Sequence, residues 1–215
     1  MQIQSTVGPT IASDQATPWV RGGRDGATVV TELHGKYYEQ ASRGKAFFGT
    51  SASAGIAIIL PATGGGHPTL FNPLGSNVNV NIIALELSYV SGNNAPGALE
   101  WAQTANAGSA AATGSPIATF TQVAATPCLI GSTAKAQALW SPTTNTFTSA
   151  PTFVRPTGLS LFTGVAATAV APFTLRAYYD GDLGLAPGTA LSLCCQTTTT
   201  TALFQVSIAW EEVAP

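Results

Sequence analysis

Metal binding is the first chemistry to consider, because two carboxylates and a histidine lie close together near the start of the chain. Glu32, His34 and Glu39 carry suitable donor atoms. Zinc sites take several ligands from His or Cys at short spacings, and the second histidine, His67, lies much further along, in GGGHPT. We therefore expect no metal centre, and we expect His67 to be an ordinary surface residue in a turn.

The patterns that could support catalysis are incomplete. GTSASAG has a serine, Ser53, where the nucleophile elbow G-x-S-x-G needs its second glycine. Glu211 and Glu212 are adjacent on a predicted strand, so their side chains point to opposite faces and do not form a glycosidase pair. Asp180 and Asp182 lie in DGDLG, which lacks the later ligands of a calcium loop and is typical of a turn. The sequence predicts a protein that is not an enzyme and needs no cofactor.

The cysteines do not form a disulfide framework, because Cys128, Cys194 and Cys195 are an odd number without regular spacing. Cys194 and Cys195 are adjacent in ALSLCCQ, where a strand would point them to opposite faces. We interpret both as small hydrophobic residues in or beside a strand. A redox or metal-binding pair is the alternative.

Charge is scarce in this chain, and its scarcity excludes one class of partner. Only 8% of the residues are charged, against about 25% in ordinary soluble domains. The formal net charge of −2 lacks the basic footprint that nucleic-acid binding requires. A surface of neutral hydroxyl and methyl groups also offers little repulsion between copies. We expect no nucleic-acid partner and a tendency to self-association.

Membrane partners are not expected either. No stretch reaches the ~20 apolar residues of a membrane span. The start, MQIQSTVGPT, lacks the basic and apolar regions of a secretory signal. We therefore expect the protein to mature in a cytoplasm.

From residue 50 onward, the chain consists of short segments rich in β-forming residues, separated by Gly, Pro and Asn. Examples are AGIAIIL before PATGGGHP and VNVNIIALELSYV before SGNNAPG. Repeated strand-length segments with turn residues between them are typical of a sandwich or barrel. We predict an all-β fold, an antiparallel jelly-roll-like β-sandwich over residues 50–215. Residues 1–49 are predicted to form an extended N-terminal arm and docking segment.

The last segment, ALFQVSIAWEEV, has the clearest alternation in the sequence. One face carries Gln205, Ser207 and other residues of mixed polarity. The other face is apolar, and an alternating strand turns such a face towards the core. The predicted core stripe is Phe204, Val206, Ile208 and Trp210.

Charged and aromatic residues concentrate in one region near the start. The chain has eight lysines and arginines and ten acids, and eight of these charged residues fall within residues 21–45. Aromatic and arginine side chains dominate interface hot spots because they bury much area and still make polar contacts. The predicted contact residues are Trp19, Glu32, Lys36, Tyr37, Tyr38, Glu39 and Arg43. The alternative is that Phe47, Phe48 and one of the tyrosines belong to the core side of a first strand.

The motif ELHGKYYEQASRGKAFF, together with the C-terminal FQVSIAWEEVAP, resembles a group of tailed-bacteriophage virion structural proteins. In that group, E-L-H-G-[RK]-Y-Y-E…R-G-x-x-F precedes an Ala/Thr/Gly-rich β domain that ends in a W-x-E strand. The match covers Glu32 to Phe47 and the last strand, whereas the middle of the chain matches mainly in composition. The resemblance implies a location in the virion, with assembly in the host cytoplasm.

The function implied by the resemblance is that of a capsid cement or decoration protein. Such a protein would form a homotrimer and bind the major capsid protein or other virion proteins, stabilising the head shell. The alternative is a receptor-binding or glycan-binding head-fibre or tail-spike module. For that alternative, the candidate sugar-binding groups are Trp101 with Glu100 and Gln103, or Trp140 with Asn145.

Overall fold

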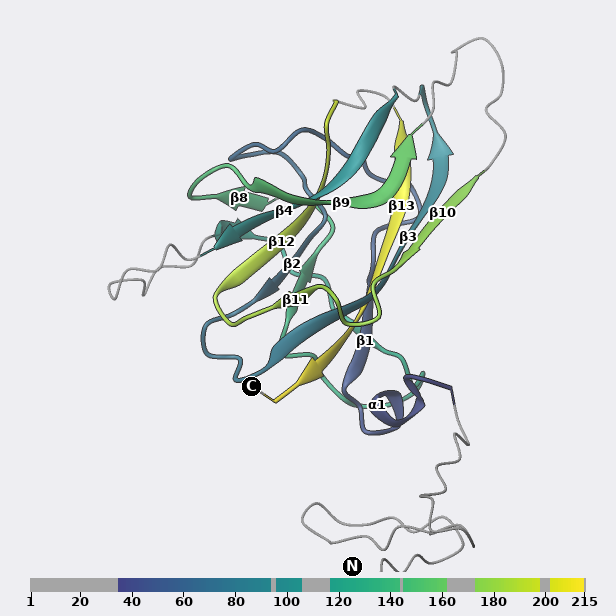
Figure 1. The fold of residues 1–215 in the computed structure, drawn as a ribbon, viewed down its shortest axis with the longest axis vertical. Coiled ribbons are helices and arrows are strands. Elements are labelled where there is room, and N and C mark those ends of the chain that lie inside the picture. Colours follow the sequence, from purple (N-terminus) through teal and green to yellow (C-terminus); the bar gives the residue numbers. More distant parts are fainter. Residues whose placement is uncertain are drawn as a thin grey trace, which may run out of the picture. The chain divides into compact units, whose positions relative to one another are not determined.

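The computed structural model describes residues 35–93, 96–105, 117–143, 145–161, 173–197 and 202–214 (Figure 1). Most of the predicted N-terminal arm, including Trp19 and Glu32, lies outside these ranges. Residues Met1–Tyr38 form one unit and Glu39–Pro215 a second unit, which contains the sheets. The elements, in chain order, are α1 (Tyr38–Ser42), β1 (Ala46–Thr50), β2 (Thr69–Asn72), β3 (Asn79–Ser91), β4 (Gly97–Ala105), β5 (Ile117–Phe120), β6 (Thr126–Pro127), β7 (Leu139–Ser141), β8 (Asn145–Phe147), β9 (Thr152–Leu161), β10 (Thr174–Tyr178), β11 (Gly184–Leu185), β12 (Thr189–Cys195) and β13 (Leu203–Val213).

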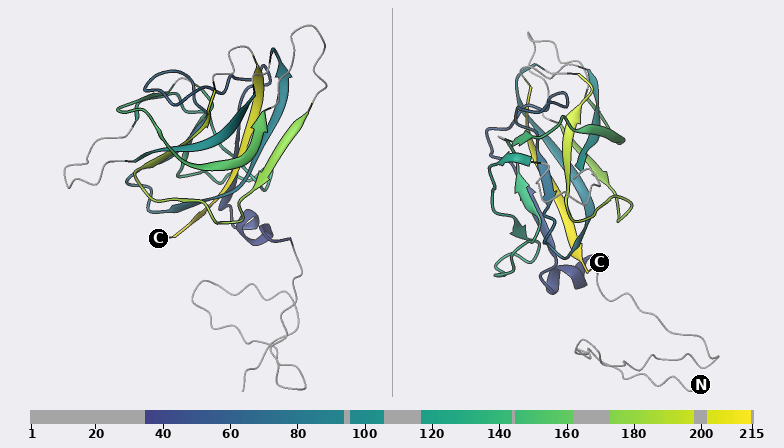
Figure 2. Two further views of the ribbon diagram at one scale, coloured as in Figure 1. Left: turned by 45° about the horizontal axis from the view of Figure 1, so that its top comes forward. Right: turned by 90° about the vertical axis from the view of Figure 1, so that its left-hand side faces the viewer.

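Two antiparallel sheets lie face to face (Figure 2). In the first sheet the strand order is β10-β3-β13-β1-β6, with β11 also paired to β3. In the second sheet it is β7-β2-β12-β4-β9. The C-terminal strands β12 and β13 thus insert between strands from the first half of the chain, β12 between β2 and β4, and β13 between β1 and β3. Apart from the short strands β6, β7 and β11, each sheet has four strands, β1-β13-β3-β10 and β2-β12-β4-β9, interleaved as in a jelly roll. The predicted all-β antiparallel sandwich is confirmed.

The two sheets differ in how their outer faces are covered. Along β13, buried and half-buried residues alternate without interruption, whereas β12 is buried at every position after its first. The second sheet is covered outside by a small cluster in which Ile117 of β5 and Phe147 of β8 pack against Phe71 and Ala190. A strand covered on both faces needs apolar or small residues throughout, which explains the unbroken run ALSLCC. The outer face of the first sheet is left half-exposed.

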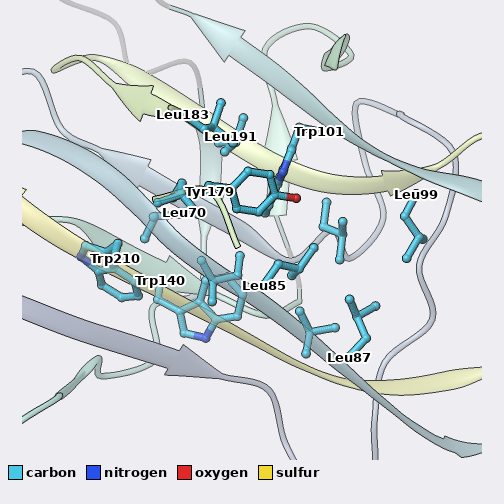
Figure 3. Packing of buried hydrophobic residues seen from close by; sticks show 14 of the residues in the cluster. Leu70, Leu85, Leu87, Leu99, Trp101, Trp140, Tyr179, Leu183, Leu191 and Trp210 are labelled. Carbon is cyan, nitrogen blue, oxygen red and sulfur yellow. The ribbon is translucent and has the colours of Figure 1, made fainter. Parts of the chain in front are cut away.

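The main core lies between the sheets (Figure 3). The apolar face of β13 contributes Phe204, Val206, Ile208 and Trp210, all fully buried and on the face that the alternation predicts. Trp101 and Trp140 from the second sheet are also fully buried. Three tryptophans in one core remove a large apolar area from water, and burial of this kind stabilises a domain without disulfides or metal.

The sandwich begins earlier in the chain than the predicted division at residues 49 and 50. Strand β1 pairs with β13 on one side, where Phe47 lies opposite Trp210, and with β6 on the other. Phe47 is buried, and its ring centroid lies 6.2 Å from that of Trp210. The four residues Ala46–Gly49, predicted as part of the docking segment, are therefore part of the sheet. The physical reason is that the backbone of β13 needs a partner on this side, and Phe47 has an apolar place inside.

Candidate functional site

The candidate contact segment, residues 36–43, consists of a turn followed by the single helical turn α1. Lys36, Tyr38, Glu39 and Arg43 are exposed, and Tyr37 is half-buried. The Lys36 ammonium lies 5.3 Å from the centroid of the Tyr37 ring. None of the residues of α1 is buried. The side chains of α1 that were predicted to make contacts are therefore at the surface, where a partner can reach them.

A local ion pair orders the helical turn. Arg43 Nε donates to Glu39 Oε1 at 2.7 Å, one turn apart, and both side chains are more than half exposed. An exposed pair at this spacing contributes only about 0.3–0.5 kcal/mol to helix stability. The pair fixes the direction of the guanidinium more than it stabilises the fold.

An apolar loop that contains Leu129 and Ile130 was not predicted from the sequence. Leu129 and Ile130 are exposed, Ile130 at 72%. The loop is tied to the chain that follows α1, because Cys128 N donates to Ala46 O at 2.9 Å. A side chain at Gly44 would collide with Ala134, so the loop packs closely there. The only signal in the sequence was the apolar pair in PCLIGS, which is equally compatible with a buried strand.

The edges of the two sheets are poorly suited to strand addition. Edge strands that avoid pairing with other chains are short, contain proline or carry charge. Strand β6 contains Pro127 and has two residues, β7 has three, and β10 has five with Arg176 at its centre. The longest edge strand, β9, contains Pro156, which has no N–H, and Gly158 at a φ of 81°. Contacts through loops and side chains are therefore favoured over an extended sheet.

Charged side chains form ion pairs along one side of the sandwich, where the edge strands β9 and β10 of the two sheets lie. Arg155 of β9 lies over the ring of Tyr179 and pairs with Asp182 at 3.2 Å. Arg176 of β10 lies 4.4 Å from the centroid of the exposed Tyr178 ring and pairs with Glu86 at 2.8 Å. Phe153 and Val154 of β9 are exposed nearby in the chain. This edge is a second region where aromatic and arginine side chains reach the surface.

The tryptophans proposed for sugar binding are not available for it. Trp101 and Trp140 are both 0% exposed. Trp140 belongs to the core, where its indole Nε1 donates to Thr50 O at 3.4 Å. Neither ring can stack on a ligand, so the glycan-binding alternative has no support from these residues.

The second histidine is a core residue, which corrects the expectation of a surface imidazole. His67 is 0% exposed, and its Nδ1 lies 3.5 Å from the Cys194 thiol. A catalytic cysteine needs an accessible thiolate. Burial raises the pKa of Cys194 to about 12, so this thiol stays protonated and acts as a packing and hydrogen-bonding group.

The described part of the chain contains neither a metal-binding cluster nor a membrane-spanning helix. Within the described part of the chain, no three residues of the His, Cys, Asp and Glu types come together in a way that could hold a metal ion. Glu32 and His34 lie outside it. None of the helices described there is long and apolar enough to cross a membrane.

Comparison with known proteins gives no relative. No protein family, curated protein or solved structure matches the chain. The fold and the surface residues are therefore the evidence for its function.

Proposed function

We propose that this chain is a virion structural protein of the bacteriophage cement or decoration type, which forms a homotrimer and stabilises the head shell. The observation that carries the proposal is the strand order, β1-β13-β3-β10 against β2-β12-β4-β9. The jelly roll with this interleaving is one of the architectures used by capsid proteins. Because a fold can serve several functions, the proposal also requires a surface suited to assembly.

The surface supports a role in assembly. A chain with 8% charged residues presents little electrostatic repulsion to its neighbours. Exposed charged and aromatic residues lie in the contact segment and at the β9–β10 edge, and the apolar pair Leu129 and Ile130 is exposed on the loop beside Ala46. Aromatic, arginine and apolar side chains at a surface are the anchors of interface hot spots.

The mechanism is passive. A trimer binds where capsid subunits meet, and its contacts resist separation of those subunits. Because the protein binds the assembled shell and not free subunits, it shifts the equilibrium towards the shell by mass action. Small stabilisation at each site is sufficient because the contact is repeated over the whole particle.

The first experiment is the mass of the purified protein in solution, measured by native mass spectrometry and light scattering at micromolar concentration. A trimer is the expected result, and a monomer would contradict the proposed trimeric assembly. The second is the copy number of the chain in purified particles, by quantitative mass spectrometry. Hundreds of copies per particle would support a shell protein, whereas a dozen or fewer would contradict it.

A variant links the assembly to the contact segment. Tyr38→Ala/Arg43→Ala should fold normally, because both side chains are exposed. Its binding to particles or to itself should weaken by tenfold or more, since hot-spot residues contribute ~2 kcal/mol or more each. Leu74→Ala, an exposed apolar residue between β2 and β3, is the matched control. If the wild type, the double variant and the Leu74→Ala control bind equally well, the contact segment does not take part in assembly.

A further inference from the structure

Both ring nitrogens of His67 are engaged inside the protein. Nε2 accepts a hydrogen bond from Ala62 N at 3.2 Å, and Nδ1 lies 3.5 Å from Cys194 Sγ. The ring is fully buried, with its centroid 5.9 Å from that of Phe147. Because Nε2 must offer its lone pair to Ala62, the proton belongs on Nδ1, facing the sulfur. Only the neutral imidazole satisfies both contacts.

The segment that precedes His67, residues 59–66, makes three hydrogen bonds, one with β12 of the second sheet, one with β8 and one with the ring of His67. Cys195 N donates to Ile59 O at 3.0 Å, and Phe147 N donates to Thr63 O at 2.7 Å. The third is the bond from Ala62 N to the imidazole. We call this segment the latch segment. It contains no charged residue, so its position depends on hydrogen bonds and packing.

The groups around the imidazole would not compensate a positive charge. On β12 the titratable neighbour is Cys194, whose thiol is neutral. On β4, Glu100 lies opposite Cys194 in the strand register, and its carboxylate accepts a hydrogen bond from Gln196 Nε2 at 2.8 Å. On β8, Asn145 and Phe147 are not titratable, and neither is any residue of the latch segment. Among the described contacts of the ring, no carboxylate faces it directly.

We propose that His67 is an acid-sensitive latch, which holds residues 59–66 against β12 and β8 at neutral pH and releases them when it is protonated. Protonation would place an Nε2–H against the N–H of Ala62, two donors facing each other, and a charge in an apolar site. Both effects disfavour the closed arrangement. Release would open the layer outside β12 that contains His67, Phe147 and Ser192, and would leave the main core between the sheets intact.

The direction of the pH effect follows from the location of the ring. Burial lowers the pKa of His67 from its ordinary value of 6.5. The opened imidazole regains that ordinary value, so the open state binds the proton more tightly. The closed state is therefore fully favoured above pH 6.5, and it loses about tenfold in population ratio for each pH unit below 6.5 until the lowered pKa is reached.

Hydrogen exchange resolved by NMR tests the latch on the whole chain at pH 7.5 and 5.0, with rates corrected for the intrinsic effect of pH. The amides of Ala62 and Phe147 should lose about tenfold or more in protection at pH 5.0, while Val206 and Ile208 in β13 keep theirs. Unchanged protection at Ala62, or an equal loss in β13, would overturn the proposal.

A variant and a direct titration complete the test. His67→Gln keeps an acceptor and a donor without a titratable group, so protection at Ala62 should no longer depend on pH. His34→Gln, at the only other histidine, should behave as the wild type. If His67→Gln does not fold, the wild-type imidazole resonances decide: a pKa below 6.5 for His67 supports the latch, and a value at or above 6.5 overturns it.

Discussion

Gly49 of β1 lies against the indole ring of Trp140, which belongs to the opposite sheet, so closely that a Cβ at residue 49 would come within 2.5 Å of the ring carbon Cγ. Real side chains do not approach this distance, and a fully buried tryptophan has no space to move. Residue 49 must therefore be glycine if Trp140 is to pack across the sandwich.

The first prediction concerns this contact. Gly49→Ala should lower the free energy of unfolding by about 1–3 kcal/mol, the usual cost of overpacking a core, measured by urea denaturation. Gly75→Ala is the matched control, because a Cβ there meets nothing within 4 Å. If the two variants are equally stable, Trp140 does not occupy the position described here.

The second prediction concerns the beginning of the domain. A chain that starts at Thr50 loses most of β1, which removes the partner of β13 and the buried Phe47. Such a chain should aggregate or lose cooperative thermal unfolding, because a long hydrophobic strand edge is exposed. A chain that starts at Glu39 keeps β1 and should unfold cooperatively. Cooperative unfolding of the shorter chain would contradict the role assigned to β1.

The third prediction concerns a buried carboxylate at the end of β13. Glu212 is almost fully buried, and its Oε1 accepts hydrogen bonds from Gln137 N and Ala138 N, both at 2.9 Å. It thereby ties the segment before β7 to the last strand. Glu212→Gln replaces one acceptor by a donor that faces these N–H groups and should cost about 1–3 kcal/mol of unfolding free energy.

The neighbouring residue provides the control for Glu212. Glu211 lies on the outer, half-exposed face of the same strand, where Asn81 Nδ2 donates to it at 3.4 Å. Glu211→Gln removes the same charge without placing a donor against buried N–H groups, so it should change stability by less than about 0.5 kcal/mol. Chemical denaturation of both variants at one pH separates the effects, and equal losses would refute the anchoring role.

The fold class could be predicted from the sequence because turn residues separate the strands and because β13 alternates cleanly. The strand with which each strand pairs could not be predicted from the sequence. Strands rich in Ala, Thr and Ser carry little information on pairing, and β1 pairs with β13 from the other end of the chain. The alternation of β13 identified the buried positions of Phe204 and Trp210 directly.

The surroundings of single residues were harder to predict. His67 follows three glycines, a context typical of an exposed turn, and only the tertiary fold places it under Phe147 and beside Cys194. The exposure of Ile130 was equally hidden, because a short apolar pair looks the same in a buried strand and in a surface loop. Residues whose environment comes from distant segments are those that a local pattern describes least well.

The fourth prediction concerns the apolar loop and follows from its exposure. Leu129→Ser/Ile130→Ser removes apolar surface that is already in contact with water. The melting temperature should therefore hardly change, since surface substitutions stay within about 0.5 kcal/mol. If the loop is buried between copies, the dissociation constant of the oligomer should rise about tenfold or more, as for hot-spot residues, measured by analytical ultracentrifugation.

Leu74→Ser, at an exposed residue outside this loop, should change neither the melting temperature nor the dissociation constant. A lower melting temperature of the double variant would mean that the loop supports the fold, and an unchanged dissociation constant would mean that copies meet through another surface.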